Sequence, residues 1–116
     1  MVYTIEQIKE IVKTVANQYD ILEIRLFGSY FDGRATTDSD LDFVVQYGPN
    51  CKGLERIRFI NDLELTLMKP IDVVNILFQP DFMKNLNMDS EKRIIYKNGD
   101  ANNNFFDINE ITYFSV

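Results

Sequence analysis

Two apolar segments that flank a loop beginning with Gly-Ser and ending with Asp-x-Asp constrain the fold of this chain more than any other feature. The first segment, Ile24 to Phe27, runs directly into Gly28-Ser29. Ten residues later, Asp40-Leu41-Asp42 runs directly into the second segment, Phe43 to Val45. Short apolar runs bounded by turn residues are typical of strands. We therefore expect a Gly-Ser turn at the end of one strand and two carboxylates at the start of the next.

The Gly28-Ser29 turn has the chemistry of a phosphate-binding site. Gly28 has no side chain, so the backbone can turn sharply there and come close to a ligand. Backbone N–H groups at such a turn favour an anion, and the hydroxyl of Ser29 can bond a phosphate oxygen or cap the helix that follows. Gly33 keeps that helix short. Arg34 either adds a positive charge for a triphosphate or is a solvated surface residue, and the sequence leaves both interpretations open.

Asp40 and Asp42 form a candidate metal site. Side chains two residues apart on a strand share a face, so these carboxylates project together while Leu41 turns into the core. Adjacent carboxylates repel each other unless a cation lies between them, and oxygen-only ligands suit Mg²⁺. In the alternative interpretation residues 38–40 are only a polar turn, because Asp-Ser-Asp is common in loops. The Gly-Ser turn before the motif and the strand after it favour the metal site.

A third carboxylate lies further along the chain, in a segment that reads as a buried strand. Lys69-Pro70 breaks the chain, and Ile71 to Ile76 follows as an apolar run with Asp72 at its second position. Acidic side chains are rarely buried without a partner. Asp72 is therefore either a strand end in water or, if this strand lies beside residues 40–45, a third member of the same site.

The Gly-Ser, ten-residue gap and Asp-x-Asp pattern, followed by a later strand Asp, resembles the nucleotidyltransferase superfamily that includes DNA polymerase beta. The short chain, with Phe27-Gly28-Ser29-Tyr30 and Gly33-Arg34-Ala35 in the pattern, is most similar to the stand-alone minimal nucleotidyltransferases of bacteria and archaea. The likeness covers roughly residues 3 to 99.

This resemblance implies a site and a reaction. Gly28 and Ser29 would bind the triphosphate of ATP. Asp40 and Asp42 would bind two Mg²⁺ ions. Asp72 would bind one of these ions and help to deprotonate the attacking hydroxyl. Members of the group often pair with a small helical HEPN-domain protein in toxin–antitoxin modules, and some transfer AMP to a tyrosine of that partner. The resemblance therefore implies an antitoxin that modifies a HEPN-domain toxin with AMP.

Two other functions remain open from the sequence. A small-molecule nucleotidyltransferase, such as one that inactivates an antibiotic, usually has a second domain to hold the acceptor, and this chain shows none. A non-catalytic antitoxin would act by docking alone. The intact set of Asp40, Asp42 and Asp72 argues against that last alternative, because an unused cluster of carboxylates costs stability through repulsion.

Composition excludes several other classes. The chain has 116 residues, enough for one modest core, and no stretch long enough for a membrane helix, so we expect a small cytoplasmic domain. Its net charge of −6 argues against direct nucleic-acid binding. It has no histidine, which excludes His-dependent triads, and one cysteine, Cys51, which we interpret as a loop thiol without a role.

The pattern along the chain predicts a single-domain α/β protein, of the α+β kind, with helices packed on a mixed sheet in a nucleotidyltransferase fold. We expect strands over 22–27, 40–47 and 71–76, with Gly48-Pro49-Asn50 ending the second. A short helix should open at Pro80, and residues 90–97 should be a helical or extended edge segment.

Two longer helices should cover this sheet. The first should begin at Thr4 with a capping box, and the second should span about 53–68, where we expect Arg56 and Arg58 on a solvated face. The residues expected to face the core are Ile5, Ile8, Ile11, Val12, Val15 and Tyr19 in the first, and Leu54, Ile57, Ile60, Leu63 and Leu67 in the second.

We assign residues 1–100 to the nucleotidyltransferase domain and 101–116 to an aromatic-rich tail of unassigned role. The tail carries Phe105, Phe106, Tyr113 and Phe114 within a dozen residues. So much apolar surface is expected to pack against protein, either within the protomer or across a homo-oligomer.

Overall fold

The computed structural model describes residues 2–75 and 91–99. Its elements follow the order α1 (Ile5–Ala16), β1 (Ile21–Phe27), α2 (Gly28–Asp32), β2 (Leu41–Tyr47), α3 (Leu54–Leu67), β3 (Ile71–Asn75), a 3₁₀ turn η2 (Glu91–Arg93) and β4 (Ile94–Lys97). The predicted helix from Pro80 and the tail 101–116 lie outside the described residues.

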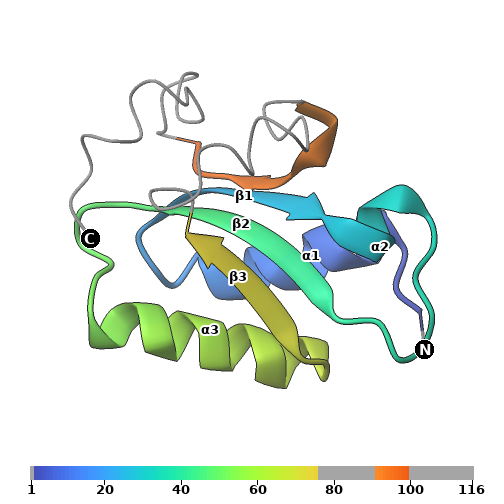
Figure 1. Cartoon of the computed structure of the whole chain (residues 1–116). Coiled ribbons are helices and arrows are strands. Elements are labelled where there is room, and N and C mark those ends of the chain that lie inside the picture. Colours follow the sequence, from blue (N-terminus) through green and yellow to red (C-terminus); the bar gives the residue numbers. More distant parts are fainter. Residues whose placement is uncertain (1, 76–90, 100–116) are drawn as a thin grey trace.

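The four strands form one mixed sheet in the order β3-β2-β1-β4 (Figure 1). β1 runs antiparallel to both β2 and β4, whereas β2 and β3 run parallel. Parallel neighbours need a crossover connection, and α3 supplies it. The prediction of a mixed sheet with helices packed on it is confirmed, and the segment predicted as helical or extended contains both forms, a 3₁₀ turn over 91–93 and an edge strand over 94–97.

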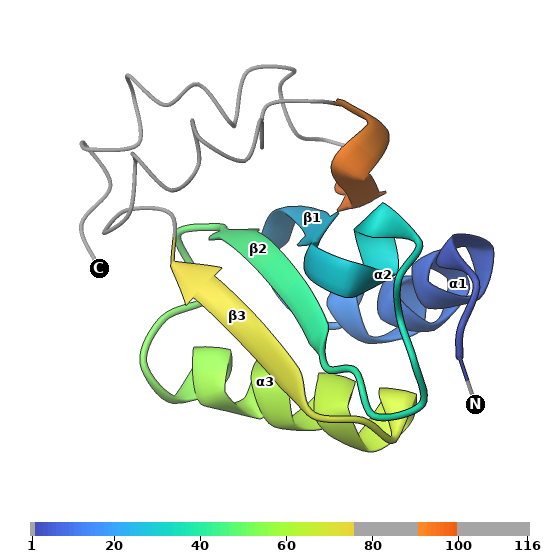
Figure 2. The ribbon, with the colours of Figure 1, turned by 45° about the vertical axis from the view of Figure 1, so that its right-hand side comes forward.

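Helices α1 and α3 lie against the same face of the sheet, and the turned view in Figure 2 shows α3 below the strands and α1 behind them. The predicted capping box starts α1. The hydroxyl of Thr4 accepts a hydrogen bond from the Gln7 backbone N–H at 3.1 Å, and the Gln7 side chain accepts one from the Thr4 N–H at 2.8 Å. These two bonds satisfy N–H groups that have no partner inside the helix.

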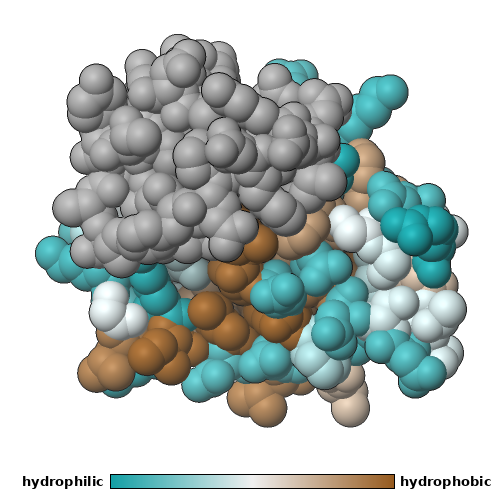
Figure 3. Space-filling model, in the orientation of Figure 1, coloured by the Kyte–Doolittle hydropathy of each residue, from teal (hydrophilic) through white to brown (hydrophobic). Residues whose placement is uncertain are grey.

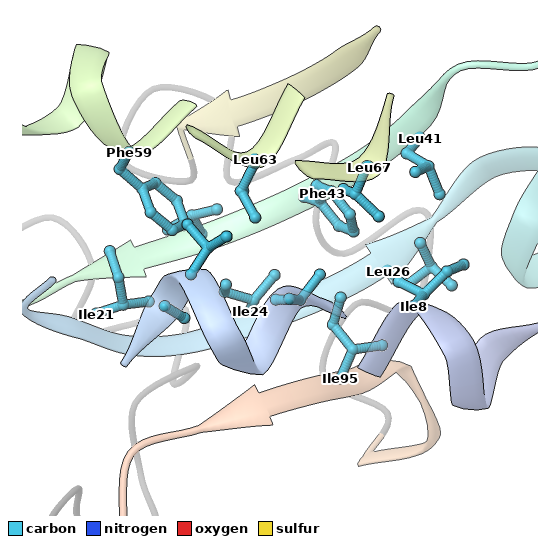
Figure 4. Packing of buried hydrophobic residues seen from close by; sticks show 14 of the residues in the cluster. Ile8, Ile21, Ile24, Leu26, Leu41, Phe43, Phe59, Leu63, Leu67 and Ile95 are labelled. Carbon is cyan, nitrogen blue, oxygen red and sulfur yellow. The ribbon is translucent and has the colours of Figure 1, made fainter. Parts of the chain in front are cut away.

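The core fills the space between this face and the two helices (Figure 4). Leu41 points into it as predicted and is fully buried. The largest side chains with less than 2% of their surface exposed come from both helices and both central strands: Ile8, Ile21, Ile24, Leu26, Leu41, Phe43, Phe59, Leu63 and Leu67.

The predicted inward face of α3 is wrong at two positions. Leu54 is 70% exposed and Ile57 is 55% exposed, whereas Phe59, which the prediction omitted, is fully buried. Phe59, Leu63 and Leu67 recur every four residues and therefore share one side of the helix. Leu54 and Ile57 lie on the opposite side. The helix carries apolar residues on two sides, and the sequence pattern did not show which one faces the sheet.

One polar prediction near α3 also needs correction. Arg56 was expected on a solvated face but is half-buried, with its guanidinium 4.3 Å from the centre of the Tyr47 ring and its Nε donating to the Cys51 carbonyl at 2.9 Å. Cys51 lies in a loop as predicted, and the structure adds that its side chain is 1% exposed and packs in the core. Arg58 agrees with its prediction, since it is exposed and pairs with Glu55.

β3 also differs from its prediction as a buried strand. In the described part of the chain it forms one edge of the sheet, where Asp72 is exposed and Ile71, Val73 and Val74 are half-buried.

Among the described helices, none has the length and apolar character required to cross a bilayer.

The corrected face of α3 can be tested by stability. Phe59→Ala should lower the free energy of unfolding by about 3–5 kcal/mol, because it leaves a cavity in the core. Thr66→Ala, an exposed change on the same helix, should alter it by about 0.5 kcal/mol or less. Chemical denaturation of both variants measures the difference, and equal losses would contradict the assigned face.

Candidate active site

Three neighbouring strands bring Gly28, Asp42 and Asp72 to one end of the sheet. The carboxyl end of β1 meets the amino end of β2, because these strands are antiparallel and Phe27 is the register partner of Asp42. The amino end of β3 lies there too, because Asp42 is the partner of Asp72 in the parallel pair. β3 thus lies beside residues 40–45, which is the condition under which Asp72 joins the site, and Asp42 and Asp72, 30 residues apart in sequence, become neighbours through the α3 crossover.

The two strand carboxylates lie on the face of the sheet opposite to α1 and α3. Leu41 and Phe43 point into the core on the helix side, so Asp42 between them points the other way. Asp72 shares its face because register partners in a sheet project on the same side, and it is exposed. Asp40 is exposed and directly precedes β2.

Gly28 fits against Asp42 in a way that no other residue could. Its φ is +74°, a region that side chains rarely adopt, and a Cβ placed on it would overlap Oδ2 of Asp42. The sequence predicted a glycine that lets the backbone turn and approach a ligand. The structure adds that the missing side chain leaves room for the carboxylate on the neighbouring strand.

Ser29 lies in the short helix α2, which ends as predicted at Gly33. Its carbonyl accepts hydrogen bonds from the backbone N–H groups of Gly33 and Arg34, the second at 2.9 Å. Within the described residues its hydroxyl has no hydrogen-bond partner, so it is available to a ligand. Arg34 is different: its side chain is 71% exposed and lies 2.8 Å from Asp32, which favours the solvated-surface interpretation.

The electrostatics of the site centre on Asp42. Burial raises the pKa of Asp42, and the negative charges of Asp72 and then Asp40 raise it further. All three predicted carboxylates therefore interact. In residues 2–75 and 91–99, however, no three acidic or thiol side chains converge enough to hold a metal ion by themselves.

These residues nevertheless fit Mg²⁺ bound together with a nucleotide. Mg²⁺ typically takes one or two carboxylates, several waters and substrate phosphates rather than a complete cage of protein ligands. Asp42 and Asp72 offer two carboxylates from adjacent strands, and Asp40 directly precedes the first residue of β2. A cation there would relieve the repulsion that raises the pKa of Asp42.

Lys69 contacts the two segments that carry the site, a role that the sequence did not indicate. Its ammonium donates to the Thr37 carbonyl at 2.9 Å and lies 5.9 Å from the centre of the Tyr30 ring. The next residue, Pro70, accepts a hydrogen bond from the Leu41 N–H at 3.2 Å. The linker before β3 thus holds both the loop that leads to Asp40 and the helix that follows Gly28.

A buried ion pair lies on β1, on the same face of the sheet as the last residue of that strand. Glu23 is 2% exposed and Arg25 is 6% exposed, and Nη2 of Arg25 lies 3.3 Å from Oε1 of Glu23. Burial raises the pKa of Glu23 and the charge of Arg25 opposes that shift. The sequence pattern predicts only a strand over 22–27, although the charges inside this apolar run are a signal that one of its faces is not plain core.

Comparisons with known proteins agree with this geometry. The family model for the polymerase beta nucleotidyltransferase domain matches residues 6–101. A Methanocaldococcus jannaschii protein, MJ1379, whose name marks it as a candidate protein adenylyltransferase, is 34% identical over 77 residues, which is 61% of this chain and 77% of the relative.

Two solved structures have a similar fold. A candidate minimal nucleotidyltransferase superposes with a TM-score of 0.60 at 27% identity, covering 69% of this chain and 83% of the other. One chain of a toxin–antitoxin complex with AMP-PNP superposes with a TM-score of 0.59 at 16% identity, covering 78% of this chain and 74% of the other. At this identity the likeness supports the fold alone. The family match over most of the chain establishes that this protein belongs to the polymerase beta-type nucleotidyltransferases and is a nucleotidyltransferase.

Proposed function

We propose that this nucleotidyltransferase transfers AMP from ATP to a hydroxyl group of a partner protein, specifically a tyrosine of a HEPN-domain toxin. The observation that carries the transfer reaction is the alignment of Gly28, Asp42 and Asp72 on three adjacent strands, with Gly28 fitted against Asp42. The name of the M. jannaschii relative supports a protein acceptor, and the toxin–antitoxin neighbour with AMP-PNP is consistent with a partner of that kind.

The reaction follows from the placement of the carboxylates. Two Mg²⁺ ions held by Asp40, Asp42 and Asp72 would neutralise the triphosphate and orient its α-phosphate. The acceptor oxygen attacks the α-phosphorus, the bond to the bridging oxygen breaks, and pyrophosphate leaves. Asp72 takes the hydroxyl proton, a role that suits its exposed position at the described sheet edge.

The phosphates are positioned by the other half of the site. The turn at Gly28 brings backbone close to the carboxylates, and the hydroxyl of Ser29 can donate to a β- or γ-phosphate oxygen. Gripping these outer phosphates leaves the α-phosphate open to attack. Arg34, which is exposed and paired with Asp32, belongs to the periphery of this arrangement.

A protein acceptor is favoured over a small molecule because Asp72 lies in the open, where the side chain of a docked protein can reach it. Identifying the labelled product distinguishes a protein acceptor from the alternative, transfer to an antibiotic-type small molecule. Labelled ATP incubated with a lysate of the native host should label one protein and no free small molecule, and the reverse pattern would favour the alternative.

Substitution of the carboxylates tests the reaction. Asp42→Asn should abolish transfer of labelled AMP to the co-purified partner, because it removes the central ligand. Asp72→Asn should slow transfer strongly while ATP still binds, because it removes the proton acceptor. Asp38→Asn, in the exposed turn, is the matched control and should be active. Metal-independent transfer, or full activity of Asp42→Asn, would rule out this mechanism.

Substitution of two glycines with similar positive φ separates the effect of the contact with Asp42 from that of backbone strain. Gly28→Ala should abolish transfer, because its Cβ displaces the carboxylate. Gly33 has a φ of +75° but open space around it, so Gly33→Ala should lose only about 1 kcal/mol of stability from backbone strain and keep its activity. Transfer assays and chemical denaturation of both variants compare them, and equal activity of the two would contradict the assigned role of Gly28.

The raised pKa of Asp42 makes stability depend on pH when divalent cations are absent. The folded state binds a proton on Asp42 more readily than the unfolded chain, so stability is present at low pH and is lost as pH rises through the raised pKa. Asp42→Asn removes that loss. In EDTA the variant should therefore melt above the wild type at neutral pH, and the gap should close in acid. Identical melting at neutral pH would count against this electrostatic picture.

A further inference from the structure

Helix α3 carries a second apolar side that no described residue covers. Its inner side, with Phe59, Leu63 and Leu67, is buried against the sheet. On the opposite side three large apolar side chains are exposed, and a fourth, Met68, directly follows the last residue of the helix. We name this set, together with the Asn at its centre, the outer stripe: Leu54 (70% exposed), Ile57 (55%), Asn61, Leu65 (76%) and Met68 (85%). Single exposed apolar residues are ordinary, but three aligned on one side of a helix, with a fourth directly after its end, mark an interaction surface.

The spacing of the outer stripe is symmetric. Its members are separated by three, four, four and three residues, so the stripe reads the same in both directions from Asn61. Two-fold dimers use one surface patch on both subunits, which must therefore complement itself. With two copies of α3 antiparallel, Leu54 faces Met68 of the second copy and Ile57 faces Leu65. Asn61 meets its own equivalent, where two amides can exchange hydrogen bonds.

The shape of the surface agrees with this pairing. An open hollow of about 470 Å³ lies beside the C-terminal half of α3, lined by Asn61, Glu64, Leu65, Met68, Lys69 and Pro70. In the antiparallel arrangement Leu54 and Ile57 of the second copy lie opposite this hollow. The N-terminal half of the stripe thus supplies protruding side chains, and the C-terminal half supplies the space that receives them. Figure 3 shows apolar surface along the lower edge of the molecule, where Figure 1 places α3.

We propose that the outer stripe is the interface of a two-fold homodimer in which the α3 helices pack antiparallel. The stripe is about 21 Å long, and a single helix pair of this length buries an area near the low end of specific interfaces. The dimer is therefore weak and depends on concentration. Because α3 covers the face of the sheet opposite to Asp42 and Asp72, the carboxylates of both copies stay open.

Sedimentation equilibrium over a wide concentration range tests the interface. The wild type should shift from monomer to dimer as its concentration rises. Leu65→Glu should weaken dimerisation at least about tenfold, because it buries an unpaired charge. Val2→Glu is the matched control: it adds the same charge at another exposed apolar residue, 44% exposed, and should dimerise normally. Melting curves should show that both variants are folded, since neither residue is in the core.

Cross-linking tests the register independently of assembly strength. Asn61→Cys should be joined to its equivalent by a short bismaleimide, because both lie at the two-fold axis. Lys13→Cys, on the exposed side of α1, should not, and the natural Cys51 is buried. The proposal is overturned by a monomer at all concentrations, by a dimer that persists in Leu65→Glu, or by absent cross-linking at position 61. It is equally overturned if Leu65→Glu only disrupts binding of a different protein.

Discussion

The fit of the Gly28 backbone against the Asp42 carboxylate is the constraint on which the rest of the site depends. It requires glycine both for its positive φ and for the space that a Cβ would take. It also requires the end of β1 to lie beside the start of β2, which fixes the antiparallel register of the central strands. The parallel strand β3 then extends the same line to Asp72. One close contact between two strands thus brings the Gly28 turn beside the carboxylates, where we propose that the nucleotide binds.

This arrangement of carboxylates is electrostatically unfavourable in the protein alone. Asp42 is partly buried beside two other negative charges, and burial followed by those charges raises its pKa. Among the described residues no positive charge lowers the pKa of Asp42, so the position of the carboxylates is maintained by the core beneath Leu41 and by the hydrogen bond from Lys69 to Thr37. A cluster of this kind is suited to bound cations, whose positive charge would offset both the carboxylates and a triphosphate.

Much of the fold and the site could be predicted because local patterns determine them. The Gly-Ser turn, the short α2, the inward Leu41 and the capping box at Thr4 all follow from neighbouring residues. The errors have a different origin. Leu54 and Ile57 were placed inside because α3 has two apolar sides, and only the sheet decides between them. The roles of Arg56 and Lys69 depend on contacts with residues that local patterns do not identify.

The central claim is that Asp42 and Asp72 hold the metal that binds the triphosphate, with Gly28-Ser29 gripping the outer phosphates. A crystal structure with a non-hydrolysable ATP analogue and Mn²⁺ in place of Mg²⁺ tests it most directly, because anomalous scattering locates the metal. The account predicts Mn²⁺ in contact with Asp42, Asp72 and a phosphate oxygen, and the outer phosphates against the Gly28-Ser29 turn. Mn²⁺ away from Asp42, or the triphosphate bound elsewhere on the protein, would contradict it.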